Sequence, residues 1–424
     1  MKKNNNVVPL QLTLAIALFV VLAIIFIPAT GTGDINIFVG WGVYAYDHSV
    51  ASSYALFKDN YPPLAFTLLY AAVALSKALG VSPFYGIKIM YLFFLTLSIA
   101  IIYMWTQRNF IKTIIFSIPL TYSCLLLGYM DICFACCLLL SIYFINKDNL
   151  LLANIFFTIA ALIKFAPLIV APFILAYALR HSIKISKSHI GAIKIFFVNI
   201  LAPPAIALFV LYLFFGDIFL LSLQRGFFHK CLTCNALNFN YFSYEVISAI
   251  KNQQNVFLAM INQTKFTHPA ISGNETQYAV AHVLFYFFYA STFIALLKKP
   301  NTPTNLMLFC IVGHMAYFTF SAEVHENHLY LSMLIAMTIA IIDERYLMMA
   351  LSIALISSVN LFLFYGFNGL DPLIEPDWTA IPEGFPYNAK IIMAIFETFY
   401  FLMLWGATVF FPGKILPTVK PASF

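Results

Sequence analysis

The sequence predicts an all-α, polytopic membrane protein that folds as a single integral membrane domain over residues 1–424. Its 424 residues are 62% hydrophobic and only 9% charged, and the mean hydropathy is +0.89. A soluble domain carries roughly 25% charged residues, so this chain has too few charges to cover a water-facing surface. The apolar residues also gather in runs that approach the roughly 20 residues a helix needs to cross a bilayer.

These apolar runs predict about 12 transmembrane helices. They cover residues 7–29, 86–105, 111–128, 132–145, 150–164, 167–179, 195–215, 279–297, 306–321, 329–342, 346–365 and 390–411. The first run is longer than the roughly 7–15 residues of a signal-peptide core and lacks a small-x-small cleavage site, so we interpret it as a span. The pair around Lys164 and Pro167 is expected to be a broken helical hairpin, because proline cannot continue the helical hydrogen-bond ladder.

Basic residues predict the orientation of the spans. By the positive-inside rule, Lys2 and Lys3 place the N-terminus in the cytoplasm, and the strongest basic cluster belongs to the loop at residues 180–194. Both lie in the cytoplasm if the apolar run Leu64–Leu79 is an interfacial helix on the outer surface rather than a span. The net charge of +6 is then a topology signal and gives no indication of nucleic-acid binding.

The same topology predicts two large outer loops, at residues 30–85 and 216–277. The first loop begins with Gly33-Asp34, continues through an aromatic segment and reaches Asn60-Tyr61-Pro62-Pro63-Leu64. A positioned carboxylate that accepts a proton from a hydroxyl accelerates its attack by roughly 10²–10⁴-fold, which suggests Asp34 as a general base. The alternative is that Asp34 caps the following helix, a common use of aspartate.

Two shorter segments supply further candidates on the same face. Asp131 follows Gly128-Tyr129-Met130 in the predicted turn between two spans. We interpret its carboxylate as a group that orients an acceptor hydroxyl or assists the base. The alternative interpretation is a solvated turn residue. Lys164 lies within an apolar run, where an ammonium must face water, an acid or a phosphate, or else snorkel to the interface.

The segment Glu323-Val324-His325-Glu326-Asn327-His328 is the densest polar cluster near a predicted span. His325 and His328 are one helical turn apart, as are Glu323 and Glu326, so these four side chains are expected to face one cavity that binds a phosphate or a sugar. The spacing differs from the His-Glu-x-x-His zinc motif, so we predict no metal site, although two carboxylates leave a divalent cation open. The alternative interpretation is an exposed loop.

The second large loop carries weaker signals. Arg225 is suited to bidentate phosphate binding, and Asn235 and Asn238 are suited to hydrogen bonds with sugar hydroxyls, although structural pairing is an equal alternative. Cys231 and Cys234 can close a small disulfide on an oxidising face. The sequence contains no Gly-rich phosphate loop, so nothing supports a nucleotide as the direct donor.

The first loop resembles that of the GT-C membrane glycosyltransferases, in particular the dolichyl-phosphate-glucose-dependent glucosyltransferases of lipid-linked oligosaccharide assembly and their bacterial relatives. The resemblance rests on Gly33-Asp34 and on Tyr61-Pro62-Pro63-Leu64, with support from Val324-His325-Glu326. It implies Asp34 as general base and Asn60, Tyr61, His325 and Glu326 as substrate-binding residues. At Asn60 the sequence departs from the family, which usually has aspartate there.

The resemblance also implies a function, namely inverting transfer of a hexose from a polyprenyl-phosphate donor to the hydroxyl of a glycan or lipid-linked acceptor. It places the enzyme in a bacterial inner membrane or the endoplasmic reticulum, with its site on the periplasmic or luminal side and without a required cofactor. One rival hypothesis is a multi-pass transporter or flippase of lipid-linked sugars, although no internal repeat supports it. Another is a non-catalytic scaffold of an envelope-assembly complex.

Overall fold

The computed structural model describes residues 21, 25–57, 61–186, 188–227, 231–251, 270–271, 273–367, 369 and 385–411. Helices make up most of this part of the chain, and the only strands described are the two-residue strands β1 (Thr233–Cys234) and β2 (Ala270–Ile271), which pair antiparallel. The first half contains helices α2 (Gly33–Asp47), α3 (Val50–Phe57), α4 (Pro63–Leu79), α5 (Pro83–Trp105), α6 (Phe110–Thr121), η1 (Tyr122–Leu126), α7 (Asp131–Asn146), α8 (Leu150–Ile163), η2 (Ala166–Val170) and α9 (Ala171–Ile185). The second half contains α10 (His189–Phe196), η3 (Phe197–Leu201), α11 (Ala202–Phe215), α12 (Asp217–Phe227), α13 (Phe239–Lys251), α15 (Glu275–Leu297), α16 (Pro303–Phe320), η4 (Glu326–Leu329), α17 (Tyr330–Ile342), η5 (Glu344–Tyr346), α18 (Leu347–Tyr365) and α19 (Phe385–Phe410).

Six of the described helical segments are long and apolar enough to cross a membrane, which supports an all-α membrane protein. They are Pro83–Trp105, Ala166–Ile185, His189–Phe215, Glu275–Leu297, Glu344–Tyr365 and Ala389–Phe410. Five shorter apolar helices coincide with other predicted runs or with the predicted interfacial helix: Pro63–Leu79, Phe110–Leu126, Asp131–Asn146, Leu150–Ile163 and Glu326–Ile342. The figure of about 12 spans stays a prediction, and most of the run at 7–29 lies outside the described residues.

The predicted break near Lys164 is confirmed. Helix α8 ends at Ile163, and Lys164 adopts an extended backbone conformation with φ −149° and ψ 138°. The chain then enters the short 3₁₀ helix η2, in which Pro167 occupies the first turn. Since proline lacks the amide hydrogen that an α-helix interior requires, it is tolerated in the first turn of the new helix.

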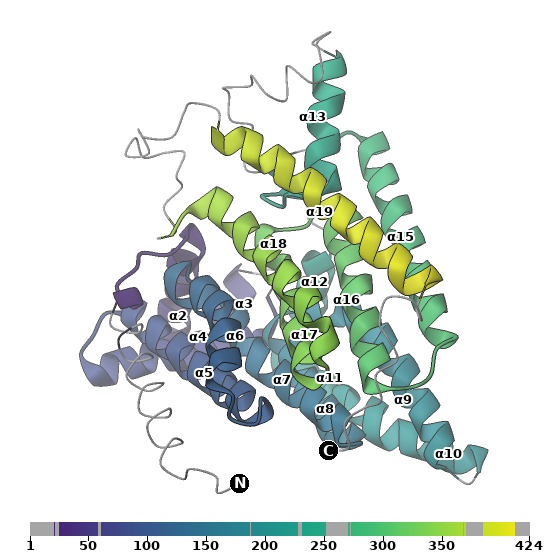
Figure 1. Ribbon diagram of the computed structural model, residues 1–424. Helices are drawn as coiled ribbons and strands as arrows, with labels where there is room; N and C mark the ends of the chain where they lie inside the picture. Colours follow the sequence, from purple (N-terminus) through teal and green to yellow (C-terminus); the bar gives the residue numbers. More distant parts are fainter. Residues whose placement is uncertain are drawn as a thin grey trace, which may run out of the picture.

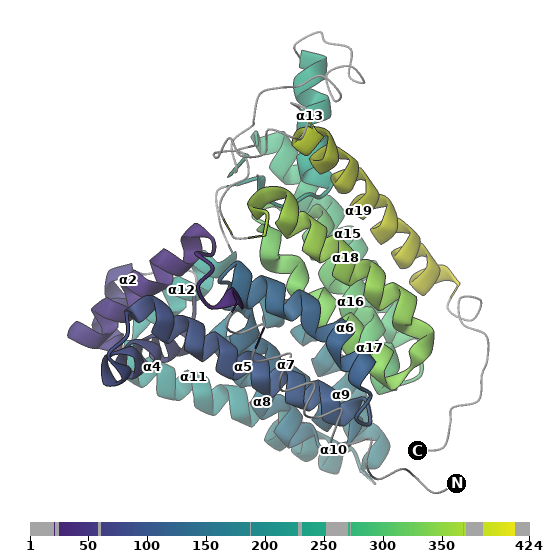
Figure 2. The same cartoon turned by 60° about the vertical axis from the view of Figure 1, so that its left-hand side comes forward.

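The hydrophobic core is centred on α16 and α17. Eleven of the 13 residues of α17 are buried, whereas none of the 14 residues of α11 is, so α11 is a peripheral helix whose apolar surface suits contact with lipid. In Figure 1, α19 crosses obliquely over α15 and α16, with which it is in contact. Figure 2 shows α2, α4 and α5 grouped on the opposite side of the molecule from α19, and α13 projecting at one end.

Several helices begin or end close together at one end of the bundle. Helix α7 packs against α5, α8 and α17, and η4 contacts α16, α17 and α18. This brings together the start of α2, the turn before α7, the end of α8 and the connection between α16 and α17, all of which carry candidate residues.

Candidate active site

The turn formed by residues 127–131 joins the start of α2 to the rest of the site. The amide of Thr32 donates a hydrogen bond to the carbonyl of Leu127 at 2.7 Å. Gly128 has a φ of +80°, and a Cβ there would lie 3.1 Å from the Cβ of Ile35. Glycine is therefore required both for the left-handed backbone and for the close approach of α2. The contact places Asp34, in the first turn of α2, beside the turn that leads to Asp131.

Asp131 is the centre of a buried ion pair. One of its carboxylate oxygens lies 2.5 Å from Nζ of Lys164, and the other accepts a hydrogen bond from the side-chain amide of Asn327 at 3.1 Å. Asp131 is only 1% exposed, and a buried charge must be paired and hydrogen-bonded to be tolerated. The ammonium of Lys164, at the end of α8, is thus paired with the carboxylate of the first residue of α7. The ring centre of Tyr61 lies 5.8 Å from the same ammonium.

Glu326 is the second buried carboxyl group of this region. Its Oε1 accepts hydrogen bonds from the hydroxyl groups of Tyr129 at 2.5 Å and Tyr365 at 3.1 Å. The side-chain amide of Asn360 donates to its main-chain carbonyl at 2.9 Å. Donors from the 127–131 turn and from α18 therefore meet at one carboxyl group in η4.

Asp34 shares the electrostatic environment of this cluster. Burial raises the pKa of Glu326 to about 7, and the negative charge of Asp34 is the next cause. Burial also raises the pKa of Tyr129, followed in order by the charges of Glu326, Tyr365 and Asp34. Asp34 itself is half-buried, whereas Asp131 and Glu326 are buried. Of the three carboxyl groups, that of Asp34 has the most access to a bound molecule.

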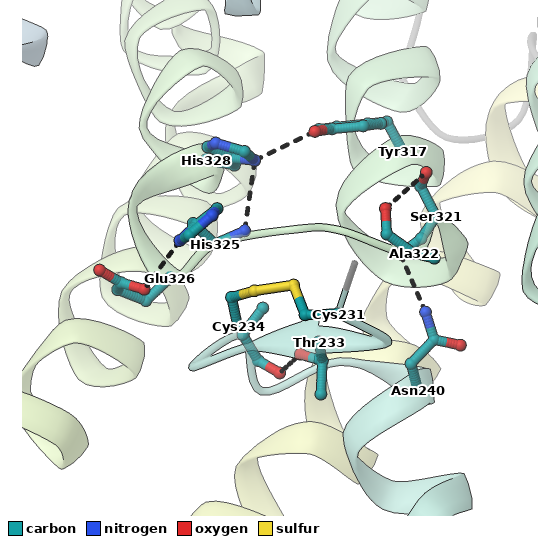
Figure 3. Close-up of a disulfide and its surroundings, with 11 residues drawn as sticks. Cys231, Thr233, Cys234, Asn240, Tyr317, Ser321, Ala322, His325, Glu326 and His328 are labelled. Atoms are coloured by element: carbon teal, nitrogen blue, oxygen red, sulfur yellow. Dashed lines mark hydrogen bonds and ion pairs between the residues drawn. A yellow bond between two sulfur atoms is a disulfide. The ribbon is translucent and has the colours of Figure 1, made fainter. Parts of the chain in front are cut away.

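His325 and His328 lie beside one another next to Glu326 (Figure 3). Their ring centres are 5.4 Å apart, and the Nδ1 of His325 is 4.0 Å from Oε2 of Glu326. The amide of His325 donates to Nδ1 of His328 at 3.3 Å, and the hydroxyl of Tyr317 lies 3.1 Å from the same atom. The two histidines and Glu326 therefore lie close together in a 3₁₀ turn rather than in a regular α-helix, and the binding cavity that they are expected to share stays a prediction.

The disulfide between Cys231 and Cys234 closes a four-residue ring beneath the His325 segment (Figure 3). The ring is joined to that segment at both ends. Glu323 donates its amide to the carbonyl of Cys231 at 2.9 Å, and Cys234 donates its amide to the carbonyl of Val324 at 2.9 Å. The disulfide that the sequence left open is thus present, and it fixes the backbone on which His325 stands.

The two predicted asparagines of the second loop hold protein groups. Asn235, with a φ of +58°, donates its side-chain amide to the hydroxyl of Tyr365 at 2.9 Å and so supports the Glu326 cluster. Asn238 is completely buried; its amide donates to the carbonyl of Phe318 at 2.8 Å, and its oxygen accepts from the amide of Tyr241 at 3.1 Å. These bonds anchor α13 to α16, and the contacts of both residues with a sugar stay predictions.

The remaining predicted residues lie at the edge of the cluster or beyond it. Tyr61 packs edge-on against Phe38 and Trp41, with ring centres 5.6 Å and 5.8 Å away. Asn60 lies outside the described residues. Arg225 is exposed in the last turn of α12, and its contact with a phosphate stays a prediction.

Four residues of the network were not predicted as site residues from the sequence. Tyr365 ends α18 and carries no motif, whereas Tyr129 and Asn327 each belong to a segment that was predicted for the sake of its neighbours. Asn360 did leave a signal, because a side-chain amide in the middle of an apolar helix must find a hydrogen-bond partner. Its side chain joins the segment before α13 to η4, because it accepts a hydrogen bond from the amide of Leu237 at 2.8 Å and donates one to the carbonyl of Glu326.

Within the described residues, no three His, Cys, Asp or Glu side chains are arranged to hold a metal ion. The fold and the site define a helical, membrane-type protein with a buried polar centre in which three carboxyl groups from separate segments are brought together. A search of protein-family models and of curated proteins finds no match to this chain.

Proposed function

We propose that this protein is an inverting membrane glycosyltransferase that moves a hexose from a polyprenyl phosphate to the hydroxyl group of a glycan or lipid-linked acceptor. One observation carries the proposal. The carboxyl group of Asp34 is half-buried and is held next to the 127–131 turn, whereas the carboxyl groups of Asp131 and Glu326 nearby are buried.

The difference in exposure among the three carboxyl groups suits a single general base. Asp131 and Glu326 are 1% and 4% exposed, whereas Asp34 is half-buried. A base must reach the hydroxyl that it activates within hydrogen-bond distance. Asp34 is the member of the set with surface available for that contact, so we assign the base to Asp34 and the positioning of the site to the other two.

The proposed reaction is a direct displacement. Asp34 takes the proton of the acceptor hydroxyl while the oxygen of that hydroxyl forms a bond to the anomeric carbon of the hexose. The bond from that carbon to the phosphate oxygen breaks, and its electron pair leaves with the polyprenyl phosphate. One displacement inverts the anomeric configuration. The phosphate is stable as an anion, so the step requires no general acid, only groups that stabilise the departing charge.

His325 and His328 are suited to stabilise the leaving phosphate. The side chain of His325 is 36% exposed and stands on backbone that the disulfide ring fixes. Lys164 contributes less, because Asp131 already balances its charge. The half-buried ring of Tyr61 lies next to the Lys164 ammonium and packs on the buried rings of Phe38 and Trp41, so Tyr61 is suited to contact the face of a sugar or a prenyl chain.

The test is incubation of the purified protein with a panel of polyprenyl-phosphate hexoses and hydroxyl acceptors, with release of free polyprenyl phosphate as the readout. Asp34→Asn is expected to lower kcat by roughly 10²–10⁴-fold. Asp47→Asn is the matched control, because Asp47 is an exposed aspartate at the opposite end of the same helix, and its rate is expected to equal that of the wild type. EDTA in a parallel reaction tests for a divalent cation.

Two outcomes would reject the proposal. If wild-type protein in vesicles moves a lipid-linked sugar across the bilayer without releasing polyprenyl phosphate, the protein is a transporter. If transfer occurs and Asp34→Asn leaves kcat unchanged, the assignment of the base is wrong.

A further inference from the structure

Lys88 is a completely buried lysine in α5, one of the membrane-length helices. Its Nζ donates a hydrogen bond to the main-chain carbonyl of Leu125, and the ring of Phe84 lies 5.5 Å from the same atom. No carboxylate pairs with it in the described part of the chain. Burying an ammonium within a membrane helix costs free energy, so a lysine at this position indicates a specific structural or functional role.

The carbonyl that Lys88 holds belongs to the π-helical turn η1, in which the chain leaves α6. Carbonyl groups at the end of a helix lack intrahelical partners and must find other donors. Two further bonds define the path beyond it. Leu127 donates its amide to the carbonyl of Tyr122 at 3.1 Å, and Tyr129 donates its amide to the carbonyl of Ser123 at 3.1 Å.

The segment that follows this turn carries much of the candidate active site. The carbonyl of Leu127 receives the amide of Thr32 and so docks the helix of Asp34. The hydroxyl of Tyr129 reaches Glu326, and Asp131 pairs with Lys164. A shift at Leu125 is therefore transmitted along six residues of chain to all three carboxyl groups.

We propose that Lys88 is a positioning residue for the active site: its ammonium anchors the end of the π-helical turn and thereby sets the 127–131 turn in register with α2 and η4. The inference rests on the proposed function for its catalytic consequence, but its structural content does not depend on that function. Lys88 is 0% exposed, so it acts through the backbone and touches no substrate.

Packing alone does not explain the lysine. Lys88→Met removes the cost of burying an ammonium but also leaves the carbonyl of Leu125 without this donor, and the two effects on stability have opposite signs. The unfolding temperature of Lys88→Met should therefore change little while the turn is freed. A misplacement of about 1 Å at a catalytic centre costs on the order of 10²-fold in rate. We expect kcat of Lys88→Met to fall by roughly 10- to 100-fold, while KM for the donor changes little.

The experiment combines kinetics with hydrogen–deuterium exchange of the detergent-solubilised protein. In Lys88→Met, the amides of Leu127 and Tyr129 are expected to exchange about tenfold faster, while the amides of α17 keep their protection. Ser98→Ala is the matched control, because Ser98 is a completely buried polar residue of the same helix whose hydroxyl has no hydrogen-bond partner in the described chain. It should change neither readout. Lys88→Gln, which keeps a shorter donor, is a second variant in case Lys88→Met does not fold.

The outcomes separate this inference from the proposed function. Unchanged exchange at residues 125–131 in Lys88→Met overturns the inference, whatever the activity. Faster exchange throughout the protein with a lower unfolding temperature also overturns it, because Lys88 would then support the whole fold. If the wild type transfers no sugar, the proposed function fails, and local exchange alone decides whether Lys88 holds the turn.

Discussion

The Nζ of Lys164 lies 2.5 Å from the carboxylate of Asp131, although the two residues are 33 positions apart, at the far ends of two helices that pack against each other. The pair closes the α7–α8 hairpin across the extended residue that ends α8. Its charges are almost wholly screened from solvent, with side chains 11% and 1% exposed.

This ion pair is expected to respond asymmetrically to substitution. Lys164→Met leaves the Asp131 carboxylate buried without its cation, which costs roughly 3–5 kcal/mol of the free energy of unfolding. Adding Asp131→Asn removes the uncompensated charge, so the double variant should recover most of that loss. Thermal unfolding of the single and double variants in detergent measures the difference. A double variant as unstable as Lys164→Met would contradict the pairing.

The two tyrosine hydroxyl groups at Glu326 are expected to be energetically coupled. Tyr129→Phe and Tyr365→Phe each remove a donor to the same oxygen, and each is expected to cost roughly 1–3 kcal/mol. Because the remaining tyrosine still serves that oxygen, the double variant should lose more than the sum of the two single losses. A double-mutant cycle by denaturant unfolding gives the coupling energy. Additive losses would show that the two bonds act independently.

The raised pKa of Glu326 predicts the pH dependence of stability. Its pKa is about 7 when folded but about 4.3 in an unfolded chain, so between these values the folded state binds more protons. Stability from this group is therefore lost as pH rises from about 4.3 to about 7 and is constant above that. Relative to Glu326→Gln, which cannot titrate, the wild type should lose on the order of 3 kcal/mol between pH 4 and pH 8. Parallel slopes for the two proteins would refute the shift.

The Cys231–Cys234 disulfide is expected to matter more for the site than for global stability. A ring of four residues constrains the unfolded chain little, so the Cys231→Ser/Cys234→Ser variant should lose only about 2 kcal/mol. The transfer activity of this variant should be lower than that of the wild type. The activity of the wild type should fall when a dithiol reductant is added and return when the reductant is removed and the two cysteines reoxidise. Cys137→Ser, at a half-buried free cysteine, is the control. Activity that is insensitive to the dithiol would show that the ring does not position His325.

The fold class and several local features followed from the sequence. Composition alone requires a membrane environment, and Pro167 correctly predicts the break after α8, since both are decided by residues adjacent in the chain. The sequence also predicts that Asp131 and the His325 segment need polar partners, because charged groups beside apolar runs are costly. Which partners they find was not predicted.

Tyr365 and Lys88 show the limit of such reasoning. Tyr365 is one of 24 tyrosines, and nothing near it marks it as a donor to a carboxyl group 39 residues away. Lys88 is a lone charge in an apolar run, but the carbonyl it holds belongs to a π-helical turn that the sequence did not predict.

The amino-acid sequence by itself determined that the chain is a helical, membrane-type protein and which segments carry polar groups at the ends of its helices, because hydrophobicity and helix breaks depend on composition and near neighbours. Only the tertiary structure decided that Asp131 is neutralised by Lys164, that Glu326 is held by Tyr129 and Tyr365, and that Asp34 is the more accessible carboxyl group. Pairing and burial of a charge depend on which distant helix ends meet, and packing of whole helices, rather than any local pattern, sets those meetings.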